Sequence, residues 1–335
     1  MFTTRKTTSR TSRTTTAKAV GALGAAALLA FTTACGGGGD GASGGEGGLE
    51  KTSVTVGALP IADFSTLWWA EEKGFFEEEG LDVTIEPVQG GPVGAQMVAT
   101  GELDFTTSTT FNTMSATDNG MPVDTAASLS GSADNSIAMY VNPDSDIQGI
   151  EDLDGKTIGI NNTNNTGDVT FRALADHLGV DVEPTFIEVP FTEMLTGVQS
   201  GSIDVGYSPE PFLSAAWDAG MRQIVDLTEG PNHEIATSNI VSGKAFLGRN
   251  PNTAAAFARA LYAANEDILA KEQEWRDWLP SIAQLDEGTA QQLPMPVFAT
   301  EMDEEGIGHV ADLMIEQGII SEDYDASEFI WTPED

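Results

Sequence analysis

The stretch GELDFTTST, residues 101–109, has a counterpart one hundred residues later in GSIDVGYSP, residues 201–209. Both begin with glycine, carry aspartate at the fourth position and continue into apolar and small residues. A short run of this kind is typical of a buried strand. The pair therefore indicates an internal repeat with a period near one hundred residues.

Two further pairs keep the same order along the chain. VTVGALP (Val54–Pro60) corresponds to KTIGINN (Lys156–Asn162), and GLDVTIEPV (Gly80–Val88) corresponds to GVDVEPTFIEV (Gly179–Val189). Each half therefore runs strand, helix, strand, helix, strand, which favours an α/β fold with parallel sheets covered on both faces. Two such units leave a cleft between them, and ligands are expected beyond the carboxyl ends of the strands.

The first helix of each half has a recognisable apolar pattern. In DFSTLWWAEEKG, residues 63–74, apolar side chains lie close to helical spacing and Gly74 is a natural stop. In TGDVTFRALADHLG, residues 166–179, four apolar residues form an i, i+3, i+4, i+7 stripe: Phe171, Leu174, Ala175 and Leu178. Both stretches are predicted to be helices packed on a sheet.

The chain does not begin a third copy of the repeat. Residues 237–251, TSNIVSGKAFLGRNP, are typical of an extended segment, and residues 252–270, NTAAAFARALYAANEDILA, of a helix. The simplest topology returns this tail to the first lobe. Two strands would then cross between the lobes, near Ile137–Val141 and near Asn239–Val241.

The one cysteine, Cys35, follows a segment with the features of an export signal. Residues 1–18 are basic, Ala19–Phe31 is an uncharged apolar run, and two small residues precede the cysteine. This arrangement resembles a bacterial lipoprotein signal, in which the cysteine is lipidated and becomes the mature N-terminus. Thr32 stands where the usual motif has leucine, so ordinary secretion with a free thiol is the alternative. Gly36–Gly48 is then a flexible tether.

The composition excludes several classes of function. The chain has 335 residues, with 15 Lys and Arg against 52 Asp and Glu and a net charge of −37. So acidic a surface repels nucleic acid and anionic lipid headgroups. A single cysteine also excludes an intramolecular disulfide and a cysteine-ligated zinc. The residues after the tether, roughly 285 of them, are enough for two lobes.

Several motifs together resemble a known family. LWWAEEKGFFEEEGLDV, GELDF, GIEDLDGKTIGI and VQSGSIDVGYSPEPF, in this order, are similar to the substrate-binding lipoproteins of ABC importers. The similarity is to the family that contains sulfonate, nitrate, taurine and thiamine-pyrimidine binders. It covers about Val54–Ala270. The resemblance implies a two-lobe, periplasmic-binding-protein-like fold of type II, with two crossover strands as the hinge, that closes on a small molecule and presents it to a membrane permease.

With this resemblance the chain divides into five segments. They are a lipoprotein signal peptide (1–34), a lipid anchor and linker (35–50), a first part of lobe 1 (51–140), lobe 2 (141–239) and a second part of lobe 1 (240–335). The expected protein is a monomer, anchored by Cys35 to the outer face of the bacterial cytoplasmic membrane, at the cell surface or in the periplasm.

Eight residues are candidates for ligand contact, because they follow strands at the cleft or match the family's pocket positions. They are Asp63, Phe64, Ser108, Thr109, Thr163, Asn165, Thr166 and Glu210. Five of them also have a structural alternative, since Asp63, Ser108 and Thr109 are suited to cap helices, Phe64 to pack in a core, and Glu210 to lie in a solvated loop. No metal site and no cofactor are expected.

The cleft residues also bear on the charge of the ligand. Asp63, Asp168 and Glu210 supply carboxylates, and the cleft loops contain no Lys or Arg. A carboxylate near an anion is unfavourable, so the sequence favours a neutral or amine-bearing ligand such as a pyrimidine. A sulfonate, nitrate or carboxylate ligand is the alternative.

Two other classes of function stay open. Some relatives of the thiamine-pyrimidine binders are enzymes of pyrimidine synthesis, but the three histidines, His177, His233 and His309, show no ligand spacing, and no GxSxG, HExxH or P-loop is present. The chain is therefore expected not to be an enzyme. A surface adhesin without a small ligand is the third class.

Overall fold

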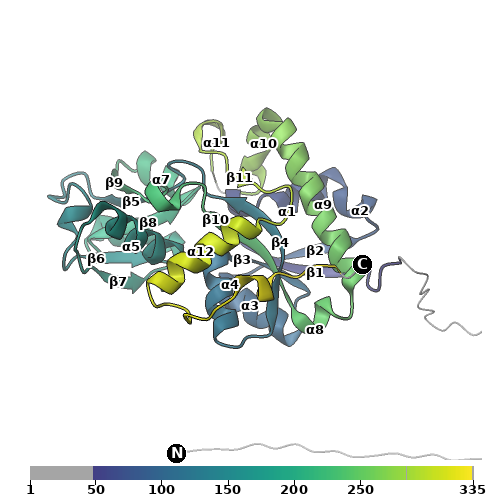
Figure 1. Ribbon diagram of the computed structural model, residues 1–335. Coiled ribbons are helices and arrows are strands. Elements are labelled where there is room, and N and C mark those ends of the chain that lie inside the picture. Colours follow the sequence, from purple (N-terminus) through teal and green to yellow (C-terminus); the bar gives the residue numbers. More distant parts are fainter. Residues whose placement is uncertain (1–47, 284, 334–335) are drawn as a thin grey trace, which may run out of the picture. The chain divides into compact units, whose positions relative to one another are not determined.

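The computed structural model of this protein describes residues 48–283 and 285–333. The expected signal segment, Cys35 and the glycine-rich linker up to residue 47 lie outside the described residues. Two separate sheets form the framework, each with helices packed on both faces, and we call each sheet with its helices a lobe (Figure 1). Among the described residues, no helix is both long enough and apolar enough to cross a bilayer.

The strands of the two sheets follow the same partial order. The first sheet runs β11 (Val297–Phe298), β4 (Val123–Gly131), β10 (Ala236–Gly243), β3 (Phe105–Thr109), β1 (Ser53–Ala58) and β2 (Asp82–Pro87). The second runs β7 (Thr185–Glu188), β6 (Thr157–Ile160), β8 (Val205–Pro209), β5 (Ile137–Val141) and β9 (Arg222–Asp226). The neighbours β3-β1-β2 match β8-β6-β7, and all four of these pairings are parallel. The repeat predicted from the sequence is confirmed.

The helices cover these sheets in chain order. They are α1 (Thr66–Lys73), α2 (Phe75–Glu78), α3 (Gly91–Thr100), α4 (Thr110–Asp118), α5 (Thr166–Leu178), α6 (Phe191–Ser200), α7 (Phe212–Asp218), α8 (Lys244–Leu247), α9 (Pro251–Ala270), α10 (Glu272–Trp278), α11 (Glu287–Gln292) and α12 (Glu304–Glu316). Short 3₁₀ turns are η1 (Ala62–Phe64), η2 (Ile150–Asp152), η3 (Gly230–Asn232), η4 (Leu279–Ser281) and η5 (Ala326–Phe329).

The sheets are mixed, so the expectation of parallel sheets was wrong in part. β10 runs antiparallel to β3 and β4, and β5 runs antiparallel to β8 and β9. The chain changes sheet at residues 132–136 and 227–235, a few residues before the expected crossovers. The reason is that β5 pairs over its length inside the second sheet and β10 inside the first.

The repeated glycine and aspartate of the opening motif have the same structural roles in both lobes. Gly101 and Gly201 end α3 and α6 in the left-handed region, with φ of +78° and +71°. Asp104 then accepts the backbone amide of Thr55 at 2.8 Å, and Asp204 accepts that of Thr157 at 2.8 Å. Asp104 thereby connects the start of β3 to β1, and Asp204 connects the start of β8 to β6. Hydrogen bonds from the hydroxyl and amide of Thr157 lower the pKa of Asp204.

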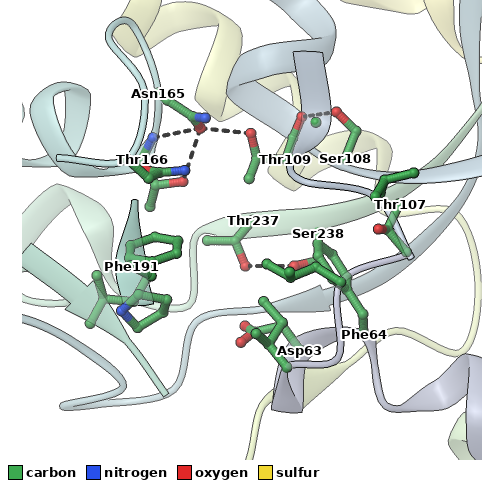
Figure 2. A pocket seen from close by; sticks show the side chains of 18 of the residues that line it. Asp63, Phe64, Thr107, Ser108, Thr109, Asn165, Thr166, Phe191, Thr237 and Ser238 are labelled. Carbon is green, nitrogen blue, oxygen red and sulfur yellow. Dashed lines mark hydrogen bonds between the residues drawn. The ribbon is translucent and has the colours of Figure 1, made fainter. Parts of the chain in front are cut away.

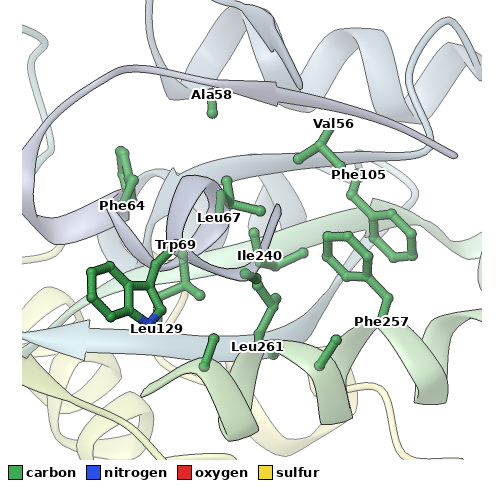
Figure 3. Packing of buried hydrophobic residues seen from close by; sticks show 14 of the residues in the cluster. Val56, Ala58, Phe64, Leu67, Trp69, Phe105, Leu129, Ile240, Phe257 and Leu261 are labelled. Atoms are coloured by element: carbon green, nitrogen blue, oxygen red, sulfur yellow. The ribbon is translucent and has the colours of Figure 1, made fainter. Parts of the chain in front are cut away.

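The main core of the first lobe lies between its sheet and the helices α1 and α9. Figure 3 shows Val56, Phe105 and Ile240 from the sheet meeting Leu67 and Phe257 from the helices. The rings of Phe105 and Phe257 stack with 4.2 Å between their centroids. Burying a side chain of this size contributes roughly 1.5–3 kcal/mol. This packing fixes β1 and β3, whose carboxyl ends lead into the site.

The core of the second lobe contains most of the predicted stripe of α5. Phe171, Leu174 and Ala175 are buried against the sheet. Leu178 is instead 52% exposed, because α5 ends at this residue and turns away from the core.

A third buried cluster joins the two lobes. Val310 and Met314 of α12 pack with Phe111 of α4 and with Val169 of α5. The side-chain amide of Gln317 donates to the carbonyl of Val169 at 3.0 Å. In Figure 1, α12 (yellow) extends from the first sheet towards α5 of the second lobe. The C-terminal helix therefore contacts helices of both lobes.

Candidate ligand-binding site

A cavity lies between the lobes and is lined by residues that follow the strands of both. β1 leads into Asp63 and Phe64, β2 into Gly90 and Gly91, and β3 ends in Thr107–Thr109. From the second lobe, β6 leads into Asn161, Asn165 and Thr166, and β7 leads into Phe191. The walls therefore lie at the carboxyl ends of parallel strands, the usual place for a ligand in such sheets.

The size of the cavity limits what it holds in this conformation. Its volume is about 70 Å³, measured over the positions that the centre of a water molecule can take. One water needs roughly 10–15 Å³ on that measure. The cavity in this conformation therefore has room for a molecule of about one small ring.

The N-terminus of α5 faces the cavity, and three backbone amides at this end have acceptors within the chain. Asp168 accepts the amides of Asn164 and Asn165 at 2.9 Å each, and the side chain of Asn165 accepts the amide of Thr166 at 2.8 Å. Arg172 approaches the Asp168 carboxylate at 3.1 Å. Helix N-termini bind anions through unoccupied amides, so this helix begins with its own negative group in that place.

The N-terminus of α4 is capped as well and touches that of α5. The hydroxyl of Thr109 accepts the amide of Asn112 at 3.1 Å and donates to Oδ1 of Asn165 at 2.6 Å (Figure 2). This hydrogen bond connects the first lobe to the second at the cavity wall. The conformation described here is therefore one in which the lobes are in contact.

The charge in the cavity wall is negative. None of the residues described as lining the cavity is Lys or Arg, and Asp63 is the carboxylate among them. Withdrawal from water raises the pKa of Asp63 to about 7, its own backbone amide opposes the shift, and the charge of Glu210 adds to it. Burial likewise raises the pKa of Glu210.

Aromatic faces and polar atoms complete the wall. Phe191 and Tyr207 lie with 5.7 Å between ring centroids, and burial raises the pKa of Tyr207, which keeps its phenol neutral. Thr237 and Ser238 project towards the space from β10 (Figure 2). Oδ1 of Asn161 is buried and has no hydrogen-bond partner among the described residues. Such a wall suits a planar molecule that carries hydrogen-bond donors.

Six of the eight predicted ligand residues line this cavity. They are Asp63, Phe64, Ser108, Thr109, Asn165 and Thr166. Phe64 also belongs to the buried core and Thr109 caps a helix, which are the structural roles expected as alternatives. Asn165 caps α5 as well. Ligand contact by these residues stays a prediction.

The structure does not bring Thr163 or Glu210 into the wall. The amide and hydroxyl of Thr163 donate to Glu188 at 2.9 Å each on an exposed loop. Glu210 turns back and accepts the amide of Ser214 at 3.1 Å, at the start of α7. Glu210 nevertheless affects the cavity, because its negative charge raises the pKa of Asp63.

Several lining residues were not among the predicted ones. Phe191 is the first residue of α6, directly after β7 and Pro190, and this position after a strand was a usable signal. Thr237 and Ser238 come from the returning strand β10, for which the repeat offers no counterpart position. Thr107, Asn161 and Tyr207 lie within or directly after predicted strands.

The three histidines lie away from the cavity lining. Nε2 of His309 is 2.7 Å from the carbonyl oxygen of Pro231, and the His177 ring packs beside Gly230, so both contact the segment between the lobes. His233 lies within the same segment, and its Nε2 is 3.4 Å from Oδ1 of Asp134. Within the described ranges, no three His, Cys, Asp or Glu side chains are grouped to hold a metal ion.

The family model and the related sequences indicate the same family. A family model described as "NMT1/THI5 like" matches residues 61–275. The chain is 25% identical over 233 residues to the 4-amino-5-hydroxymethyl-2-methylpyrimidine phosphate synthase THI13 of Saccharomyces cerevisiae, covering 65% of this chain and 67% of the yeast protein.

Solved structures share the fold at low sequence identity. The alkanesulfonate-binding protein SsuA from Xanthomonas axonopodis pv. citri, bound to MOPS, matches with a TM-score of 0.71 at 15% identity, over 84% of this chain and 98% of that one. The periplasmic nitrate-binding protein NrtA from Synechocystis PCC 6803 matches with a TM-score of 0.66 at 14% identity, over 84% and 85%. The two-lobe, periplasmic-binding-protein-like fold predicted from the sequence is confirmed.

Proposed function

This chain belongs to the NMT1/THI5-like family, and from that premise we propose that it is the extracytoplasmic solute-binding component of an ABC importer. It captures a small molecule between its lobes and delivers it to the importer's permease. The observation that carries the proposal is the cavity, whose wall is built from strand ends and helix N-termini of both lobes. A ligand held there contacts both lobes at once, so binding favours closure.

The ligand proposed is neutral or amine-bearing and of about one ring, for example a pyrimidine. Three features support this choice: the carboxylate of Asp63, the absence of Lys and Arg from the described lining, and the helix N-termini that hold their own acceptors. The structural neighbours that bind sulfonate or nitrate keep an anionic ligand as the alternative.

An enzyme of pyrimidine synthesis is the second candidate, because the curated yeast relatives carry that name at 25% identity. The two functions differ in what happens to the solute. A receptor's melting temperature rises with solute concentration and the solute is recovered unchanged.

We therefore expect one class of solute, from a panel of pyrimidines, alkanesulfonates and nitrate, to raise the melting temperature in a concentration-dependent way. A free concentration of a hundred times Kd corresponds to about 2.7 kcal/mol of stabilisation. Mass spectrometry of the solute after incubation provides the control. Conversion of the solute would indicate an enzyme, and a protein indifferent to every solute would favour an adhesin.

The proposed location is the outer face of the bacterial cytoplasmic membrane, with Cys35 as the lipid anchor. Cys35→Ser is expected to abolish acylation and to move the protein from the membrane fraction to the soluble one, because the acyl chains supply the membrane affinity. Membrane fractionation with intact-mass measurement checks this. A variant that stays in the membrane fraction, together with a wild type that carries no acyl chain, would contradict the anchor.

A further inference from the structure

Asp63 presents an isolated carboxylate to the cavity. Its backbone carbonyl accepts the hydroxyl of Ser130 at 3.2 Å, but across residues 48–283 and 285–333 no other residue donates a hydrogen bond to its side chain. By contrast, Asp168 in the same region has two amides and Arg172 as partners. The only donor to Asp63 within the described chain is therefore its own backbone amide, and a carboxylate partly withdrawn from water is unfavourable with so few donors unless a ligand supplies another.

The groups that face Asp63 add negative charge or none. From the second lobe, Glu210 lies close enough for its charge to act on Asp63, and Tyr207 of β8 is neutral. Glu193, in the first turn of α6, is exposed to solvent. The other neighbouring elements, β4, β10 and α6, contribute the uncharged residues Ser130, Thr237, Ser238 and Phe191.

Asp63 and Glu210 belong to different lobes, so their proximity depends on closure. Asp63 follows β1 of the first sheet, and Glu210 follows β8 of the second. Separation of the lobes would return Asp63 to water and remove the charge of Glu210. In the closed conformation both the withdrawal of Asp63 from water and the repulsion from Glu210 are present, and no Lys or Arg among the described lining residues offsets them.

We infer that the cavity takes a small organic cation, and that a positive charge delivered to Asp63, by the ligand or by a proton, is the condition for the two lobes to close. This inference rests on the proposed function, because it assumes lobes that open and close around a solute. The receptor would then select its ligand by charge in addition to shape. Asp63 is then the residue that determines specificity for charge.

The same arrangement makes closure without ligand depend on pH in a defined direction. The pKa of Asp63 is about 7 in the closed form, against the ordinary value of 3.8 that applies once the carboxyl is in water. Because closure raises this pKa, the closed form is favoured at low pH and loses that advantage as pH rises to 7. The closing constant of the ligand-free protein is expected to fall about tenfold per pH unit between roughly pH 5 and pH 7, and to level off above.

Small-angle X-ray scattering of the dialysed, ligand-free protein from pH 5 to pH 8 tests this. The radius of gyration of the wild type should increase with pH, whereas Asp63→Asn, which carries no charge at any pH, should stay closed throughout. Glu210→Gln should stay closed to a higher pH than wild type, because it removes the repulsion between the two carboxylates that opposes closure. Asp144→Asn, which removes an exposed carboxylate outside the cavity lining, is the matched control and should behave as wild type. A wild-type radius that does not follow pH, or that follows it equally in Asp63→Asn, overturns the inference.

Three ring-sized probes that differ in charge test the ligand class directly. At pH 8, benzylammonium should bind more tightly than benzyl alcohol, and benzenesulfonate most weakly, in ligand-detected NMR titrations. Asp63→Asn should abolish the preference for the cation. If the lobes follow pH as expected but no solute of any class is bound, the receptor proposal fails and the account of closure stands. If solutes bind and close the lobes without regard to charge or pH, the receptor proposal stands and this inference is overturned.

Discussion

Asp63→Asn is expected to weaken the binding of an amine-bearing solute by about ten- to a hundredfold. A hydrogen bond between a charged amine and a carboxylate contributes about 1.5–3 kcal/mol, and about 1.4 kcal/mol corresponds to a factor of ten in Kd. Asp63 is the carboxylate in the described cavity wall, and no other residue of the described chain donates to it. Calorimetry with the solute that remains bound after purification measures the change.

Glu210→Gln provides a matched comparison for this variant. Glu210 accepts the amide of Ser214 and is not among the lining residues, so its substitution should change the affinity less than that of Asp63. Glutamine keeps a carbonyl oxygen for that amide. If Asp63→Asn binds the solute more tightly than wild type, the ligand is an anion, and sulfonate, nitrate or a carboxylate takes the place of the amine.

The fold was predictable because equivalent residues of the two repeats have the same structural role. Glycine at 101 and 201 ends a helix in the left-handed region, and aspartate at 104 and 204 ties two neighbouring strands together. These roles need particular residue types, so they remain visible in the sequence even where the flanking residues differ. The order strand, helix, strand follows from them.

The direction and the sheet of the crossing strands were less predictable. Each of β5 and β10 is a short buried strand, and neither the apolar run of β5 nor the mixed sequence of β10 indicates a strand direction or a pairing partner. Their antiparallel pairing is decided by contacts far away in the sequence, with β8 and β9 for one and with β3 and β4 for the other. The observed crossovers therefore lie a few residues before the expected ones, and both sheets contain antiparallel pairs.

The residues of the candidate site were predictable where they lie between the end of a strand and the start of a helix. Asp63, Thr109 and Asn165 could be identified because parallel sheets place such residues at one edge. Sequence position does not give the direction of a side chain, however. Glu210 follows β8 as expected, yet its carboxylate turns to the amide of Ser214. Thr237 enters the cavity from a strand that returns after the repeat has ended.

Thr237→Phe is expected to abolish solute binding altogether. Thr237 is 4% exposed and lies beside the middle of the cavity (Figure 2). Its hydroxyl makes two long contacts, of 3.4 Å each, with the Ser130 carbonyl and the Ser238 hydroxyl, so little is lost when it is replaced. A phenylalanine ring directed into a space of about 70 Å³ leaves no room for a solute. Thr237→Val, which removes the hydroxyl and keeps the volume, is the matched control.

Native mass spectrometry of these proteins as purified, or after incubation with the stabilising solute, tests the central claim that the cavity between the lobes is the binding site. The account predicts one solute mass per chain in wild type and in Thr237→Val, and none in Thr237→Phe. Melting temperatures without solute show that the variants are folded. A folded Thr237→Phe protein that retains the same solute at the same occupancy would place the binding site elsewhere and contradict the account.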